Sequence, residues 1–201
     1  MWNAALAGFA LGGGLIVAIG AQNAFVIRQG VLNQYVFWVC LFCSLSDAVL
    51  IWGGTYGLAA VLAVFPSLVT IMRYGGAAFL VWYGIKALRR ALHPVAMGDS
   101  AQDTRSLQSA LAMCAAFTWL NPHVYLDTVA LVGSIANARP AGEQAPFALG
   151  ASLASFAWFF GIGYGAKALR EPLSRPQVWR GIDFAIAAIM LWLAIKLLLG
   201  F

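Results

Sequence analysis

Apolar residues run in long blocks along this chain, and charged residues are confined mostly to the short stretches between the blocks. A helix that crosses a bilayer needs about 20 predominantly apolar residues. Six blocks reach or approach this length, at about residues 4–27, 34–63, 67–88, 107–137, 144–168 and 182–199. The pattern therefore predicts an all-α integral membrane protein with six transmembrane helices.

The composition agrees with this prediction. The chain is 62% hydrophobic and 9% charged, whereas soluble domains carry about 25% charged residues. Its net charge of +5 does not indicate nucleic-acid binding, because the basic residues lie between apolar blocks, where they orient helices. The first block begins at Trp2 without a basic segment before it, so we expect a retained helix rather than a cleaved signal peptide.

Two of the six blocks contain polar interruptions. The fourth holds Asn121-Pro122, followed by His123 and Asp127, and the first holds Gln22-Asn23 after Gly20. Proline cannot donate to the helical ladder, so the carbonyl of Thr118 should lose its partner. Within a bilayer, such a break is tolerated only where protein or a water-filled cavity covers the freed backbone. We expect helices 1 and 4 to be interrupted near Asn23 and Asn121-Pro122, and to line a site.

The two halves of the chain resemble each other. Residues 43–57 align with residues 151–165, and residues 73–88 align with residues 183–198. The identical pairs include Ser44/Ser152, Gly53/Gly161, Tyr56/Tyr164, Gly57/Gly165, Trp82/Trp192 and Lys86/Lys196. The alignment predicts a single transporter domain over residues 1–201, with one repeat at about 1–89, a linker at about 90–106 and a second repeat at about 107–201. Three helices are an odd number, so the second repeat must be inverted, as in many secondary transporters.

The alignment also pairs the polar positions of the two halves. Asn23 matches Asn121, and Asp47 matches Ser155. Interrupted segments in corresponding positions indicate a binding site near the membrane midplane. The matched glycines, Gly53/Gly57 and Gly161/Gly165, we interpret as packing positions between the repeats, since small residues four apart let helices approach closely.

The distribution of Lys and Arg predicts the orientation. Nine lie on the side of loops 1, 3 and 5 and three on the other side, which places those loops in the cytoplasm and both termini outside. The nine are Arg28, Lys86, Arg89, Arg90, Arg105, Lys167, Arg170, Arg175 and Arg180, and the three are Arg73, Arg139 and Lys196.

Two acidic residues, Asp47 and Asp127, lie well inside predicted helices. An intramembrane carboxylate is a functional hypothesis by default, so Asp47 is a candidate for binding a substrate cation or a coupling proton. The alternative is a structural carboxylate bonded to a helix end or to Arg28. Asp127 lies four residues after His123, on the same helix face. These two residues form either a mutually satisfied pair or part of the site, with His123 a second proton candidate.

Uncharged polar and aromatic side chains complete the predicted substrate site. Amides can cap broken helices or contact substrate, and helix N-termini favour a carboxylate. Two intramembrane acids suit a cationic side chain, over which aromatic rings can lie, although interfacial or packing roles are open for each ring. The substrate-binding candidates are Gln22, Asn23, Asp47, Trp52, Asn121, Tyr125, Asp127 and Ser155.

Other functional classes have weaker signals. Cys40 and Cys43 form a C-x-x-C that could be an intramembrane redox pair, but no βαβ pattern surrounds them, so we favour a packing role in a helix. His93 and His123 lack zinc-ligand spacing, so we predict neither a metal nor a cofactor, and no enzyme activity. Aspartate and asparagine oxygens leave open the export of a divalent cation, and neutral amino acids are a further alternative substrate.

Three motifs resemble the lysine/arginine exporter family, most closely its arginine exporter branch. They are Ala18-Ile19-Gly20-Ala21-Gln22-Asn23-Ala24-Phe25-Val26-Ile27-Arg28-Gln29-Gly30, Ser46-Asp47-Ala48 and Thr118-Trp119-Leu120-Asn121-Pro122-His123-Val124-Tyr125-Leu126-Asp127-Thr128. The branch for neutral amino acids usually has Pro-Gly-Pro where Ile19-Gly20-Ala21 stands here.

The resemblance implies efflux of L-arginine, L-lysine or toxic analogues across the bacterial inner membrane, driven by exchange with protons or by membrane potential. It marks Asp47, Asn121 and Asp127 as family motif positions. It does not rank arginine against lysine, and both a monomer and a homodimer fit.

Overall fold

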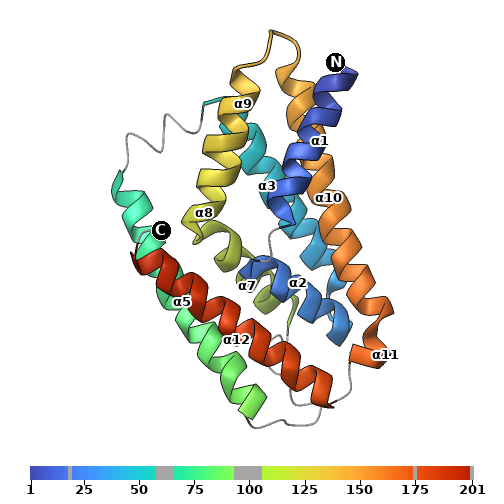
Figure 1. Ribbon diagram of the computed structural model, residues 1–201, viewed down its shortest axis with the longest axis vertical. Helices are drawn as coiled ribbons and strands as arrows, with labels where there is room; N and C mark the ends of the chain where they lie inside the picture. The colour runs from blue at the N-terminus through green and yellow to red at the C-terminus, as the bar shows by residue number, and fades with distance from the viewer. Residues whose placement is uncertain (18–19, 58–65, 93–105, 174–175, 200–201) are drawn as a thin grey trace.

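A computed structural model describes the chain except residues 18–19, 58–65, 93–105, 174–175 and 200–201 (Figure 1). Within the described residues, every regular element is a helix. The elements are α1 (Trp2–Ile16), α2 (Ala21–Leu32), α3 (Val36–Thr55), α5 (Pro66–Leu92), α7 (Leu107–Trp119), α8 (Pro122–Val124), the π-helix η2 (Tyr125–Val132), α9 (Gly133–Asn137), α10 (Gln144–Ala168), α11 (Arg170–Leu173) and α12 (Pro176–Leu199).

The predicted helices appear in order, with differences at their ends. The fifth block matches α10 over residues 144–168. The second block was predicted to reach residue 63, and α3 ends at Thr55, with residues 58–65 outside the described chain. The stretch between the fifth and sixth blocks was predicted to be a loop, and this is wrong for residues 170–173 and 176–181, which lie in α11 and at the start of α12. Helix α5 continues to Leu92, past the predicted start of the linker at about residue 90, and residues 93–105 lie outside the described chain.

By length and hydropathy, three described helical stretches can each cross a membrane, namely Val36–Thr55, Gln144–Ala168 and Arg180–Leu199. The pair α1 and α2 meets the same test when taken together, with a bend of 83° between its halves, and would make a fourth span. The 27-residue α5 carries Arg73, Lys86, Arg89 and Arg90, and α7 is an apolar helix of only 13 residues.

Helices α3 and α10 pack against each other in the middle of the molecule (Figure 1). The Cys40 thiol donates to the carbonyl of Phe159 at 3.2 Å, and the Ser155 hydroxyl donates to Asp47 at 2.8 Å. Residue numbers rise along one helix as they fall along the other, so the two helices are antiparallel.

The broken helices pack on this central pair at glycines. A Cβ on Gly8 of α1 would collide with the carbonyl of Phe147 on α10, and one on Gly30 of α2 would collide with Gly163 of α10. Gly54 of α3 lies equally close to Val129 of η2, where a Cβ would come within 2.6 Å of the carbonyl oxygen. Both halves of the first broken helix therefore lie on α10, and the second broken helix lies on α3.

Helices α5 and α12 form a second antiparallel pair on one side of the molecule (Figure 1). At one end, Arg73 donates to the carbonyls of Leu197 and Leu198 at 2.7 and 2.6 Å, which satisfies acceptors at the end of α12. At the other end, the Arg90 guanidinium bonds Asp183 at 3.1 Å. A charged side chain therefore joins each end of this pair.

An aromatic cluster and one glycine join the α5–α12 pair to the rest of the molecule. Phe79 and Tyr83 of α5 lie 4.8 and 5.0 Å from Phe117 of α7, measured between ring centroids. Gly76 of α5 lies against the Leu120 carbonyl at the break after α7. The second helix break is thus covered by α5, as the bilayer requires of freed backbone groups.

The packing role predicted for Gly161 and Gly165 is wrong. Both are exposed, and a Cβ at either position would meet nothing within 4 Å. The close contact on α10 is made by Gly163, two residues away and so on the opposite face of the helix.

Two glycines of α10 give a matched test of this packing. We expect Gly150→Ala to lower the midpoint of thermal unfolding in detergent, because its Cβ would collide with the Ala5 backbone, and overpacking costs about 1–3 kcal/mol. Gly161→Ala should leave the midpoint unchanged or raise it, since alanine is favoured in helices by about 0.5–1 kcal/mol. Equal midpoints for the two variants would contradict the described packing.

Candidate functional site

Asp47 lies at the contact of the two central helices. Its side chain is buried, at 6% exposure, and the hydroxyl of Ser155, which is fully buried, donates to it at 2.8 Å. No basic side chain of the described residues forms an ion pair with Asp47, so Arg28 is not its partner. A carboxylate offers about four acceptor positions, and one neutral hydroxyl satisfies only part of that capacity. The structure thus brings together Asp47 and Ser155, the two residues that the repeat alignment matched.

The first break is held by Asn23. Its amide nitrogen donates to the carbonyl of Ile16 near the end of α1 at 2.9 Å, and its oxygen accepts from the Trp158 indole of α10 at 3.3 Å. The break itself lies before Asn23, which belongs to the first turn of α2, and Gly20 is the extended residue at the N-cap. Asn23 therefore caps the broken helix, as one of its two predicted roles, and ties the break to α10.

The second break is held by Asn121. Its side-chain oxygen accepts from the backbone N–H of His123 at 3.1 Å and caps α8, with Pro122 in the first turn. Its own N–H reaches the Thr118 carbonyl at 3.4 Å, so the carbonyl expected to lose its partner regains one. Tyr125 donates its hydroxyl to the carbonyl of Trp119 at 3.0 Å. This bond gives Tyr125 a structural role across the break.

Cys43 and Asp47 of α3 interact with small polar side chains of neighbouring helices. We call this group the central polar cluster, and its members are Gln22, Cys43, Asp47, Cys114 and Ser155, with Thr118 included by its place one turn beyond Cys114. The Cys43 thiol interacts with the side chains of Cys114 and Gln22. Asp47 lies one turn beyond Cys43 on α3, and Thr118 lies one turn beyond Cys114 on α7.

Two members of this cluster have polar atoms with no partner at hydrogen-bonding distance among the described residues, although Gln22 also lies close enough to interact with the Cys43 thiol. The Thr118 hydroxyl is buried in a residue with no exposed surface, and the Gln22 amide nitrogen is also buried. Buried polar groups are normally satisfied. A cluster that holds a buried carboxylate without a cation, an unsatisfied amide donor and an unsatisfied hydroxyl is the arrangement expected of a site that binds a polar ligand.

Three predicted site residues lie elsewhere. Trp52 is 36% exposed and stacks on Tyr56 with 5.9 Å between ring centroids. Asp127 is exposed, and no ion pair joins it to His123. The buried Nε2 of His123 has no hydrogen-bond partner among the described residues. The structure therefore shows neither the predicted His123–Asp127 pair nor a bond between these residues and the central polar cluster.

The cysteines are packed as small buried residues. Cys40, Cys43 and Cys114 are free and fully buried.

Among the described residues, no group of three or more His, Cys, Asp or Glu side chains could hold a metal ion. The central polar cluster offers a carboxylate, hydroxyls and an amide, which suit an organic cation better than a metal that needs several charged ligands.

Sequence reasoning did not select two residues of this region. Trp158 holds Asn23, and its signal was its place three residues after Ser155, on the same face of α10. Thr118 was considered only for its backbone carbonyl, although its hydroxyl is the buried, unsatisfied group. Both could have been found by following the helix faces that carry Asn121 and Ser155.

Comparisons with known proteins cover nearly the whole chain. The profile of the LysE type translocator family matches residues 14–200. The "Putative amino-acid transporter YggA" of Aeromonas salmonicida is 41% identical over 202 residues, which cover 100% of this chain and 98% of that protein. The "Arginine exporter protein ArgO" of Salmonella newport is 40% identical over 191 residues, or 94% of this chain and 90% of the relative. No solved structure matches the chain.

Proposed function

Because this chain belongs to the LysE type translocator family, we propose that it exports L-arginine and L-lysine across the bacterial inner membrane. Membership in a family of translocators makes the protein a transporter rather than an enzyme. The apolar helices agree with a multi-pass membrane protein. The arginine exporters among its relatives support a basic substrate.

The observation that carries the proposal is the buried Asp47 without a cation. A buried charge is costly unless it is paired, and Ser155 supplies only a neutral hydroxyl at 2.8 Å. A guanidinium or ammonium group of the substrate would provide the missing charge, and charge-assisted hydrogen bonds are about twice as strong as neutral ones. A proton would neutralise the same carboxylate when substrate is absent, which would couple export to protons.

The substrate carboxylate would be bound by uncharged groups. The Gln22 amide nitrogen and the Thr118 hydroxyl lack partners among the described residues. Gln22 lies in the first turn of the 12-residue α2, where backbone N–H groups favour an anion. Neutral donors suit a zwitterion with one extra positive charge, because they add no cation to compete with it.

Helix contacts support two inverted repeats. Asp47 and Ser155 are equivalent positions 108 residues apart, and they contact each other. Equivalent residues that touch lie close to the twofold axis that relates the two copies. Their helices, α3 and α10, are antiparallel, as an axis in the membrane plane requires.

The α5–α12 pair follows the same relation. Arg73 and Asp183 are equivalent under the shift of 110 residues. Arg73 binds the carbonyls of Leu197 and Leu198 at the end of α12, and Asp183 binds Arg90 in the last turn of α5. Each equivalent position thus holds the end of the opposite helix.

These contacts favour a mechanism of alternating access around a fixed site. The broken helices and the α3–α10 pair build the central polar cluster, while α5 and α12 pack mainly on each other. Rocking of the two repeats would open the cluster first to one side and then to the other, with proton exchange or membrane potential driving export. The exposed Asp127 and the stacked Trp52 would contact substrate only on its way to or from this cluster.

We propose cytoplasmic loops 1, 3 and 5 with both termini outside, on the nine-to-three excess of Lys and Arg. A reporter fused after Phe201 that is active only outside the cytoplasm should therefore be active. Activity of a cytoplasm-specific reporter at that position would contradict this orientation.

Counterflow in proteoliposomes tests the substrate. We expect vesicles loaded with unlabelled arginine to accumulate labelled arginine and lysine, because both present a cation to Asp47. Labelled leucine and Mn²⁺ should not accumulate. Accumulation of leucine or Mn²⁺ without arginine or lysine would replace the proposed function by one of the two alternative substrates. A Cys40→Ser variant should still transport, which would exclude a redox role, because a redox pair requires both Cys40 and Cys43.

Asp47 is tested by a substitution that keeps its shape. Asp47→Asn should abolish arginine counterflow while expression and monodispersity stay normal, because the amide cannot pair with a guanidinium. Ser155→Ala is the matched control: it removes the donor but keeps the charge, and should reduce apparent affinity by roughly 10- to 100-fold without abolishing transport, since one hydrogen bond to a charged group contributes about 1.5–3 kcal/mol. Undiminished counterflow by Asp47→Asn would disprove the role of Asp47.

A further inference from the structure

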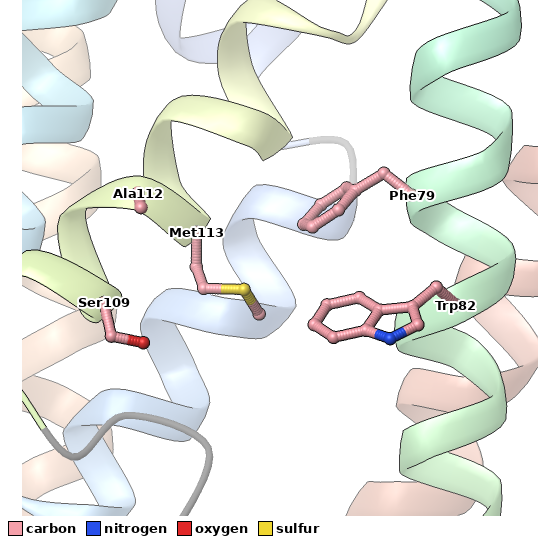
Figure 2. Close-up of a pocket in the computed structure, with 5 residues that line it drawn as sticks. All are labelled: Phe79, Trp82, Ser109, Ala112 and Met113. Atoms are coloured by element: carbon pink, nitrogen blue, oxygen red, sulfur yellow. The ribbon is translucent and has the colours of Figure 1, made fainter.

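A second cavity lies away from the central polar cluster, between α5 and α7. Its volume is about 450 Å³, and it is lined by Phe79 and Trp82 of α5 and by Ser109, Ala112 and Met113 of α7. Figure 2 shows the two aromatic side chains reaching from α5 towards the Met113 side chain on α7. The volume falls in the range of small-molecule sites, about 300–1,000 Å³.

The cavity is an apolar groove that opens to the surroundings. Trp82 is 47% exposed, and Ala112 is also exposed. The lining holds two polar side-chain groups, the Ser109 hydroxyl and the Trp82 indole N–H. In a membrane protein, an exposed groove of this composition faces acyl chains rather than water.

One end of the groove is basic. The Lys86 ammonium lies 4.5 Å above the centre of the Trp82 ring, and Arg89 is exposed one turn before the end of α5. The N-terminus of α7, capped by Ser106, lies at the same end, because α5 and α7 run in opposite directions past the groove.

We propose that this groove binds one anionic phospholipid of the surrounding bilayer. One acyl chain lies against Phe79, Trp82 and Met113, and the phosphate of the headgroup is held by Lys86 and Arg89. Basic residues at the end of an apolar groove between transmembrane helices are the arrangement that recognises an anionic headgroup together with its chain. The bound lipid fills the space between the α5–α12 pair and α7.

The second repeat provides a matched control. Lys196 lies 5.0 Å above the Trp192 ring on α12, and these residues are the equivalents of Lys86 and Trp82. Trp192 does not line the groove. If Lys–Trp pairs bound anionic lipid in general, substitution in either pair would weaken lipid binding. A specific site in the groove predicts weaker binding only for substitutions in the pair on α5.

Native mass spectrometry of the purified full chain tests the headgroup. We expect one phosphatidylglycerol molecule to be retained more strongly than phosphatidylcholine of the same chains. A Lys86→Gln, Arg89→Gln double variant should lose about 30-fold in affinity for phosphatidylglycerol, from the typical contribution of two basic residues to anionic lipid binding. Lys196→Gln should keep wild-type affinity. Equal retention of the two lipids, or an equal loss in both sets of variants, would overturn the proposal.

The groove itself is tested by filling it. Ala112→Phe should displace the acyl chain and reduce retention of phosphatidylglycerol, while Ala188→Phe, at an exposed position of α12, should not. In wild-type protein, phosphatidylglycerol with brominated chains should quench Trp82 fluorescence, measured as the difference from a Trp82→Phe variant. Normal retention by Ala112→Phe, or no quenching difference, would show that the lipid does not occupy this groove.

Discussion

A carboxylate buried at the contact of two antiparallel helices, with one neutral hydrogen-bond donor, is the interaction around which this molecule is arranged. Asp47 is held by Ser155 at 2.8 Å, and the described residues supply it with no cation. A structural ion pair would neutralise the carboxylate permanently, and no uncompensated charge would remain to bind a cationic ligand. Here the helices keep the carboxylate under-satisfied, which makes binding of a cation or a proton favourable whenever one can enter.

The two helix breaks expose backbone groups, and side chains of the broken helices reduce the free-energy cost of that exposure. A bilayer offers no water to freed backbone groups. Asn23 bonds the end of α1, and Asn121 bonds the start of α8. The Thr118 carbonyl is satisfied by the next N–H of the break. Side chains at each interruption thus satisfy backbone groups of the described residues, and the buried side-chain groups that these residues leave without a partner include Gln22 and Thr118 of the central polar cluster. The difference matters, because side-chain groups can exchange partners with a ligand without unwinding a helix.

The sequence predicted the helix order, the two breaks and the Asp47–Ser155 pairing, because each depends on local residue types or on the internal repeat. The predictions that were wrong are those that depend on tertiary packing. Gly163 rather than Gly161 and Gly165 makes the close contact on α10, since the repeat reveals which glycines match but not which face turns inward. Asp127 and His123 share a face in an α-helix, whereas Asp127 lies in the π-helix η2, whose turns contain more residues, and the two form no pair. The role of Trp158 depends on a contact 135 residues away along the chain, which no local pattern contains.

The place of Asp47 beside its own repeat equivalent has a consequence for the energetics of transport. Under the proposed symmetry, the inward-open and outward-open states differ because the two repeats exchange conformations. Every group far from the axis is then carried across the molecule, but a group on the axis returns to nearly the same point. The negative charge would remain stationary while the openings change sides, so its interaction with a bound cation would be similar in both states. Such a transporter would bind its substrate with similar affinity on both sides of the membrane. The direction of net transport would then be set by the gradients of substrate and protons and by the membrane potential.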